Sequence, residues 1–512
     1  MLRSTVIILW IVCSIQAISL VSLQKQSPFQ IDSESITRQD FDIWLSEQKD
    51  IAFKNILKNI GGISPSLNTT LVPEGVVIAS PSSEHPNYFY QWVRDSALTI
   101  RSLIYHLDDS KFDDLEISKT IEAYIANNHK LQRLPNLSGS FDDDYSGLGE
   151  PKFHADLTAF NEHWGRPQRD GPGLRASTIT SYLNVLEKYG KNPSHKDLSD
   201  CKYVYSEIIK PDLLYIVKNW NKSGFDLWEE IDSNHFFTSI TSLRAIQDGI
   251  ILYKRYDNED DQFFQQLEST YTELKNFIEN DSGFQQQHIP YIVECPQLLK
   301  EGKRSGLDAA TLLGSLHSHS LENKNLQQVY EDIPFDIDDS HIINSFRAMV
   351  ADMKYRYPVN RFRTGFGVGL GRYPEDIYDG YATSEGNPWF ISTASASEIL
   401  YKIVFKLNSN GDDLVITKST KEFFSQFIDL QDSIEDVVIQ YGSEEYEKVT
   451  LNLMEYADSF LAVIKDHVDN SGRMSEQFNK YDGFMQGAED LTWSYSAVWN
   501  CIRWRGKALA IL

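Results

Sequence analysis

Apolar residues recur with the period of an α-helix along most of this chain, and no other feature constrains the fold as strongly. In residues 446–468, Val449, Leu453, Phe460 and Ile464 fall on one helical face. The same periodicity predicts about thirteen helices. They cover residues 36–60, 94–107, 115–128, 174–189, 201–219 with a break at Pro211, 236–256, 262–279, 309–317, 342–357, 389–406, 422–428 (the weakest), 446–468 and 490–509.

Long segments rich in Gly, Pro, Asp and aromatic residues separate some of these helices: 138–173, 367–388 and 470–489. Loops of this length within a compact domain are usually functional. Around a dozen helices with elaborate connections predict an all-α helical barrel, in which helix hairpins form a ring and the loops build one face. The sequence contains no low-complexity linker and no obvious short repeat, so we expect one catalytic-sized domain.

Three carboxylates occur within residues 223–230, which read Ser-Gly-Phe-Asp-Leu-Trp-Glu-Glu. Like charges at this spacing repel, and burial against an apolar wall raises the pKa of a carboxyl group. A carboxylic acid that stays protonated near neutral pH beside an aromatic ring is what glycoside hydrolysis requires. The alternative is a solvated acidic helix start, where the helix dipole favours Asp and Glu. The cluster alone does not decide between them.

Aromatic residues make up 12% of the chain. Four of them lie in residues 87–96, just before the adjacent pair Arg94 and Asp95. An aromatic wall beside a charged pair is suited to sugars, because rings stack on sugar C–H faces and charge-assisted hydrogen bonds hold hydroxyl groups. The alternative is core packing beside an Asp near a helix N-terminus.

Residues 164–173 contain too many Gly and Pro residues for a regular helix or strand, so we expect a rigid loop. This loop would present Trp164 to a sugar, with Arg166 and Gln168 as hydrogen-bond donors. The alternative is a structural turn held together by Arg166 and Asp170.

Two later segments supply further candidates. Arg372 is a possible donor to a substrate, whereas Trp389 is either a stacking platform or a packing residue at a helix start. Glu476 is a second carboxylate, remote in sequence from Glu229, and taken alone it is more typical of a surface residue.

The net charge of −25 argues against nucleic-acid and anionic-membrane partners. An early Arg3 and a short apolar run predict a signal peptide over residues 1–20 rather than a membrane span. With such a signal, the Asn-x-Ser/Thr tripeptides become candidate glycosylation sites: Asn68, Asn136, Asn221 and Asn280.

The mature chain keeps an odd number of cysteines, so that at most one internal disulfide can form and its pairing stays open. These cysteines are Cys201, Cys295 and Cys501. Neither a Cys-x-x-Cys nor a His-x-x-x-His spacing suggests a metal site, and we expect no cofactor.

Together these segments resemble the glucoamylase family of inverting glycoside hydrolases, and the yeast glucoamylases most closely. The matching runs occur in the family's order from about residue 36 to the C-terminus: YFYQWVRDSALTI, GLGEPKF, WGRPQRDGP, SGFDLWEE, HFFT, GRYPEDIYDG, EGNPW, SEQFNKYDGFMQGA and LTWSY. An ordered set of runs is far more specific than one motif. The resemblance implies an (α/α)6 barrel and the release of β-D-glucose from the non-reducing ends of starch, glycogen and maltodextrins.

The resemblance also implies roles for the carboxylates. Glu229 corresponds to the general acid and Glu476 to the general base, although Asp226 matches an aspartate that is sometimes assigned as the base. Inversion requires a water between sugar and base, so the two carboxyl groups stand roughly 6.5–9.5 Å apart on opposite faces of the sugar. Asp226 lies on the same turn as Glu229. We therefore expect Glu476 to be the base and Asp226 to support the acid.

The remaining matches are binding residues. Sugar-binding positions of the family correspond to Arg94, Asp95, Leu227, Trp228, Glu230 and Arg372, and the aromatic lining corresponds to Tyr88, Trp92, Trp164 and Trp493. We expect a single catalytic domain over residues 21–512, with no starch-binding domain, that acts as a monomer on α-glucans. The expected location is extracellular or cell-wall, with the vacuole as the alternative.

Two other functions stay open from the sequence. One is a different hydrolase on a helical toroid, such as a glucosidase or a trehalase-like enzyme, and substrate preference would distinguish it. The other is a sugar-binding or cell-wall protein that kept the cleft. The presence of both Glu229 and Glu476 argues against the second, because either residue could be lost without harming binding.

Overall fold

The computed structural model describes residues 39–63, 67, 71–321, 333–361, 366–430 and 435–512. The predicted signal peptide and the sequon at Asn68 lie outside these residues. Within the described part of the chain, no helix is both long enough and apolar enough to cross a membrane.

A closed ring of helices forms the centre of the molecule, because each helix contacts the next and the last contacts the first. In order around the ring these are α3 (Val93–Asp109), α5 (Asp170–Lys188), α8 (Phe236–Tyr256), α11 (Ala309–Ser318), α15 (Phe390–Asn410) and α18 (Thr492–Leu509).

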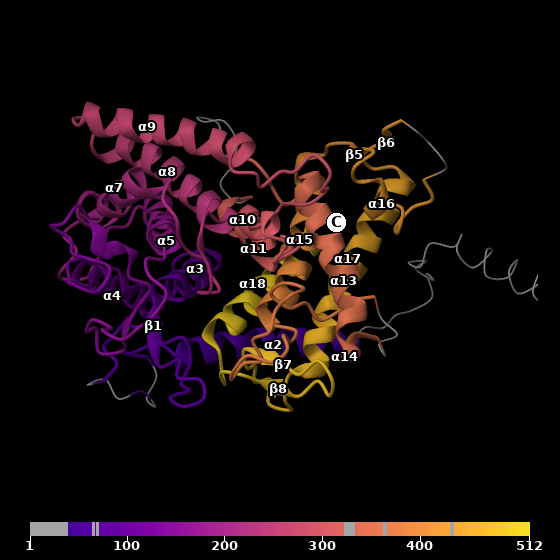
Figure 1. Cartoon of the computed structure of the whole chain (residues 1–512), viewed down its shortest axis with the longest axis horizontal. Helices are drawn as coiled ribbons and strands as arrows, with labels where there is room; N and C mark the ends of the chain where they lie inside the picture. The colour runs from indigo at the N-terminus through magenta and orange to yellow at the C-terminus, as the bar shows by residue number, and fades with distance from the viewer. Residues whose placement is uncertain (1–38, 64–66, 68–70, 322–332, 362–365, 431–434) are drawn as a thin grey trace, which may run out of the picture.

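A second helix packs outside each member of this ring. The pairs are α2 (Gln39–Lys58) on α18, α4 (Leu115–Gln132) on α3, α7 (Lys210–Asn219) on α5, α9 (Asp261–Asn276) on α8, α13 (Ser340–Arg356) on α11 and α17 (Glu444–His467) on α15. The early helices α4 to α9 lie on one side of the view in Figure 1, and α13 to α17 lie on the other. The predicted (α/α)6 barrel is confirmed.

Short elements connect the helices. They are α6 (Cys201–Val204), α10 (Pro296–Lys300), α14 (Pro358–Arg361), α16 (Lys421–Phe424), the 3-10 turn η1 (Ser146–Gly149) and the π-helical turns η2 (Tyr205–Ile209) and η3 (Phe277–Asp281). Two-stranded antiparallel sheets pair β1 (Tyr90–Trp92) with β2 (Lys152–His154), β3 (Gly224–Phe225) with β4 (Asp232–Ser233), β5 (Leu414–Ile416) with β6 (Val437–Ile439) and β7 (Gln477–Phe478) with β8 (Met485–Gln486).

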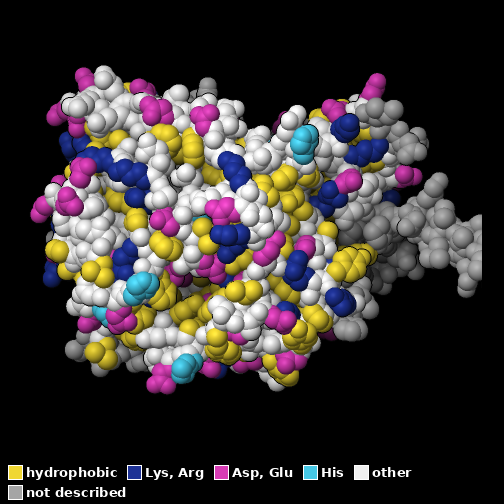
Figure 2. Space-filling model, viewed as in Figure 1, with side chains coloured by type: hydrophobic (Ala, Val, Ile, Leu, Met, Phe, Trp, Pro, Cys, Tyr) yellow, Lys and Arg dark blue, Asp and Glu magenta, His cyan; other side chains and the backbone are white. Residues whose placement is uncertain are grey.

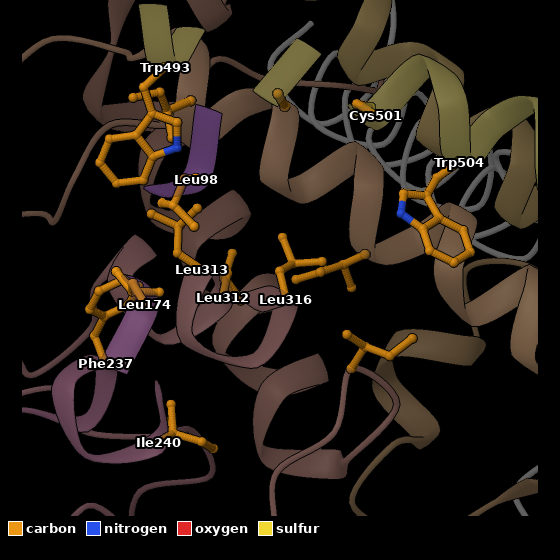
Figure 3. Packing of buried hydrophobic residues seen from close by; sticks show 14 of the residues in the cluster. Leu98, Leu174, Phe237, Ile240, Leu312, Leu313, Leu316, Trp493, Cys501 and Trp504 are labelled. Carbon is orange, nitrogen blue, oxygen red and sulfur yellow. The ribbon is translucent and has the colours of Figure 1, made fainter. Parts of the chain in front are cut away.

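The core fills the centre of the inner ring. In α15, every residue from 390 to 404 is buried, as expected for a helix that is enclosed on all sides. Leu98 of α3, Phe237 of α8, Leu313 of α11 and Trp493 of α18 contribute to one cluster (Figure 3).

Many helix boundaries differ from the prediction by a few residues, and two of the differences involve proline. The helix predicted over 201–219 does not break at Pro211; instead, η2 precedes it, and Pro211 lies in the first turn of α7. Residues 170–173, predicted as loop, form the first turn of α5. A proline is tolerated in the first turn because its missing N–H has no helical partner there.

One end of the barrel collects the starts of the inner helices. Arg94 and Asp95 open α3, whereas Trp389 and Trp493 lie at the starts of α15 and α18, and all of them line a single cavity. Among the inner helices, only α11 has a side-chain cap, from Asp308. The partial positive charge of helix N-termini therefore concentrates at this cavity.

Candidate active site

The loop between β3 and β4 carries Glu229 on a tight turn. Its backbone N–H donates to the carbonyl of Asp226 at 3.0 Å, and its φ is 67°. This left-handed conformation is uncommon for a residue other than glycine. The Asp226 carboxylate, which is 3% exposed, accepts the N–H groups of Glu230 and Ile231 at 2.7 and 2.8 Å. These bonds hold the turn that directs Glu229.

The Glu229 carboxylate accepts two hydrogen bonds on the same oxygen. The indole N–H of Trp92 donates to Oε1 at 2.6 Å, and the Gln168 amide donates at 2.8 Å. The Arg94 guanidinium lies 3.6 Å from this oxygen. Two segments remote in sequence, one with Trp92 and Arg94 and the other with Gln168, therefore fix the orientation of Glu229.

Arg94 and Asp95 form a buried charged pair at the start of α3. Arg94 Nη1 donates to Asp170 at 2.9 Å and to Gln168 at 3.1 Å. Arg94 Nε lies 3.6 Å from Asp95 and, among the described residues, has no hydrogen-bond partner. Burial raises the pKa of Asp95 to about 6, although the positive charge of Arg94 opposes this shift. Both residues line the cavity.

Glu230 lies at the centre of a cationic group. Arg372 Nη2 donates to its Oε1 at 2.8 Å, Arg304 donates to its Oε2 at 2.7 Å, and the Tyr373 hydroxyl also donates to Oε2. Burial alone would raise the pKa of Glu230, but these partners outweigh it and lower the pKa. Asp376 holds Arg372 from the other side, at 2.6 and 2.9 Å.

Glu476 approaches the cavity from the loop before β7 and is 1% exposed. Its N–H donates to Ala488 at 2.9 Å. Burial raises the pKa of Glu476 to about 8, whereas hydrogen bonds from the Tyr88 and Tyr378 hydroxyls and the charge of Arg372 oppose this. The two hydroxyls lie 3.0 Å apart.

These groups surround one cavity of about 280 Å³. The predicted site residues line it except Asp226, which lies behind the turn, and Arg166 and Gln168, which were predicted as donors to a sugar. Its other lining residues are Ala79, Tyr378, Trp389, Ile391 and Leu491. Tyr378 was not among the predicted residues, although it falls within the matching run GRYPEDIYDG. Trp389 directly precedes α15 and its ring meets that of Trp228 edge-on at 5.5 Å, as the packing alternative predicts, and it also lines the cavity.

The prediction that Arg166 donates to a sugar is wrong. Its Nε bonds both carboxylate oxygens of Glu150, at 2.8 and 2.9 Å, and its Nη2 bonds the Phe160 carbonyl. The structural alternative is therefore correct for Arg166. Asp170, however, pairs with Arg94 instead.

No cluster of three or more His, Cys, Asp or Glu side chains suited to a metal ion occurs in the described ranges. Cys201, Cys295 and Cys501 are free thiols. The site therefore consists of carboxylates, guanidinium groups, phenols and indoles. Figure 2 shows one face of the molecule, where Lys and Arg are interspersed with Asp and Glu.

Comparison with known proteins gives a consistent result. The family model of glycosyl hydrolases family 15 matches residues 55–503. A glucoamylase of Saccharomycopsis fibuligera is 39% identical, over 96% of this chain and 94% of its own length. The intracellular sporulation-specific glucoamylase of Saccharomyces cerevisiae is 36% identical, over 92% of this chain and 85% of its own.

Solved structures agree with these relatives. The Saccharomycopsis fibuligera glucoamylase superposes with a TM-score of 0.87 at 39% identity, covering 95% of this chain and all of that one. The glucoamylase of Hypocrea jecorina gives 0.78 at 31% identity and covers 91% of this chain and 72% of its own.

Proposed function

Since this chain belongs to glycosyl hydrolase family 15, we propose that it removes terminal 1,4-linked α-D-glucose from the non-reducing ends of starch, glycogen and maltodextrins, with inversion to β-D-glucose. The observation that carries this proposal is that Glu229 and Glu476, which are remote in sequence, line one cavity together with Arg94 and Arg372. Two carboxyl groups around a sugar site are the requirement for glycoside hydrolysis.

Glu229 is the general acid in this proposal. Trp92 and Gln168 both donate to Oε1, so the proton for the glycosidic oxygen resides on Oε2. As the C–O bond breaks, the proton passes to the leaving oxygen, and positive charge develops on the terminal sugar. The ionised Glu229 then keeps both hydrogen bonds, together with the nearby charge of Arg94.

Glu476 is the general base. It takes a proton from a water that attacks the anomeric carbon on the face opposite Glu229. A base must be ionised, and burial works against ionisation of Glu476, whereas Tyr88, Tyr378 and Arg372 favour it. These three partners offset part of the effect of burial, and Glu476 acts as the base in its ionised form.

Asp226 supports the acid rather than serving as the base. Its Oδ1 already accepts two backbone N–H groups, and the residue is not part of the cavity lining. The geometry favours a role in holding the turn of Glu229.

The charged side chains that line the cavity are suited to binding the end of a glucan chain. Arg94, Asp95 and Arg372 are each at least 92% buried but line the cavity, so their polar atoms are available to the hydroxyls of one terminal glucose. Trp228 is oriented by its indole N–H, which donates to Asp308 at 2.9 Å. The inner helices close the cavity from below, which favours release of single glucose units.

We also propose that residues 21–512 form one catalytic domain that acts as a monomer and enters the secretory pathway, with an extracellular, cell-wall or vacuolar destination. Asn221 and Asn280 are exposed and are the better glycan acceptors, although the Asn280 amide donates to the exposed Asn276 side chain at 3.0 Å. Asn136 is less suited, because its side-chain amide donates to the Leu134 and Gly147 carbonyls.

Carboxamide variants and product analysis test the proposal together. Glu229→Gln and Glu476→Gln should each lower kcat on maltotriose by roughly 10²–10⁴-fold, with KM little changed. Glu116→Gln, at an exposed position on α4, is the control. With maltoheptaose, glucose should be the only early small product. Early maltotriose, near-wild-type rates in both carboxamide variants, or a preference for trehalose would each contradict the proposal.

A further inference from the structure

The ammonium group of Lys152 lies in a cage of aromatic rings. Its Nζ is 3.1 Å from the ring centroid of Trp164, 4.3 Å from Trp92, 4.4 Å from Phe160 and 4.7 Å from Tyr90. Lys152 is 1% exposed. The ring faces attract a cation, and the attraction grows when water is excluded.

The cage is built by the β1–β2 pair and the loop that follows it. Lys152 stands directly opposite Trp92 in this antiparallel register, which brings their side chains into contact. The chain then continues through Phe160 to Trp164, which cover the ammonium group. α3 begins directly after Trp92, so this contact also fixes the start of the helix that carries Arg94.

Two rings of the cage belong to the proposed active site. Trp92 and Trp164 line the cavity, whereas Lys152 does not. The Lys152 cation therefore acts on the cavity through these rings. Trp92 also donates to Glu229, so the Trp92 ring contacts both the Lys152 ammonium group and the proposed acid.

The surroundings of Lys152 act on its charge in both directions. Burial and the positive charge of Arg166 lower the pKa of Lys152, whereas the negative charges of Glu229, Glu162 and Glu150 raise it, and the net result is a pKa of about 8. The ammonium group is therefore charged in acidic solution.

We propose that Lys152 is a positioning residue of this site, whose caged cation holds the Trp92 and Trp164 rings in place and, through Trp92, the orientation of Glu229. The inference rests on the proposed function, because it takes Glu229 as the general acid. Lys152 touches neither the substrate nor the reacting atoms.

Three variants test the inference. Lys152→Met keeps most of the length of the side chain and removes its charge, Lys152→Arg keeps the charge, and Lys210→Met is the matched control. Lys210 is another lysine above an aromatic ring, 4.6 Å from Phe263, and lies outside the cavity lining. Melting temperatures establish that each variant is folded.

Lys152→Met should lower kcat/KM on maltotriose roughly 30-fold, the size of one desolvated cation–π contact. Lys152→Arg should recover much of the activity, because it restores the cation in the cage, and Lys210→Met should keep the wild-type value. Equal losses in the Met and Arg variants, or wild-type activity in Lys152→Met, would overturn the inference.

Failure of the proposed function would be recognised separately, as a wild-type protein that releases no glucose. The inference is then decided by hydrogen–deuterium exchange of residues 158–169. Faster exchange in Lys152→Met than in Lys152→Arg would support positioning by the cation, and equal exchange would overturn it.

Discussion

The backbone N–H of Glu229 donates to the Asp226 carbonyl at 3.0 Å, in a turn where Glu229 has a φ of 67°. The proposed acid is thus held in an uncommon conformation by a second carboxylate residue of its own loop. Such conformations persist where the surroundings enforce them, and they concentrate at functional sites.

The hydrogen bonds of this turn predict different losses of activity for two substitutions of Asp226. Asp226→Ala leaves two part-buried N–H groups without their acceptor, which costs up to about 1–3 kcal/mol for each group, and should lower kcat by misplacing Glu229. Asp226→Asn keeps an oxygen acceptor and should retain more activity, as measured by steady-state kinetics on maltotriose. If Asp226→Asn were as inactive as Glu476→Gln, Asp226 would be the better candidate for the base.

The pH dependence of activity should respond to Tyr378. Its hydroxyl lowers the pKa of Glu476, which burial raises to about 8. Tyr378→Phe removes this hydrogen bond, so the pKa of Glu476 rises further. A base must be ionised to act, and the acidic limb of kcat/KM should therefore move to higher pH. An unchanged or lower limb would contradict the role of Glu476.

Gly487 leaves space for Glu476. A Cβ at this position would lie 2.4 Å from Glu476 Oε2, and Gly487 has a φ of +79°. Gly487→Ala should therefore lower kcat by displacing the base. Gly442→Ala is a matched control, since its φ is +73° but nothing lies within 4 Å of the added Cβ. Equal activity of the two variants would show that the site tolerates displacement of Glu476.

Stability should depend on a buried ion pair away from the cavity. Arg175, 2% exposed, bonds both oxygens of Asp212 at 2.5 and 2.8 Å. Arg175→Met leaves this carboxylate buried and unpaired, so the free energy of unfolding should fall by about 3–5 kcal/mol. Denaturant unfolding would measure this loss. Lys119→Met, which removes an exposed pair with Glu116, should leave the unfolding midpoint unchanged.

Much of the fold could be predicted from the sequence, because apolar residues in long amphipathic helices recur with a clear helical period. The helix at 236–256 was predicted with its observed bounds. The first turn of α5 was missed, since Gly171 and Pro172 are typical of loops. Its formation depends on close packing against α3, where a Cβ on Gly171 would lie 3.0 Å from Val93.

Most residues that line the cavity could be predicted from short runs of distinctive residues. The contacts that hold these residues in place could not. Gln168 was expected to face a sugar, yet its amide bonds Glu229, 61 residues away. Lys152 is part of the run GLGEPKF, but nothing in that run indicates a cage that Phe160 and Trp164 complete. The roles of Gln168 and Lys152 depend on which distant segments lie side by side in the fold, and local sequence patterns do not contain that information.

The most direct test of the account is the configuration of the first glucose released. Proton NMR of maltotriose digestion by the mature protein, at about pH 5, would follow the anomeric signals before mutarotation. The account predicts that β-glucose appears first, because Glu476 directs water to the face opposite Glu229. α-Glucose appearing first would mean retention through a nucleophile close to Glu229, and would contradict the Glu229–Glu476 pair.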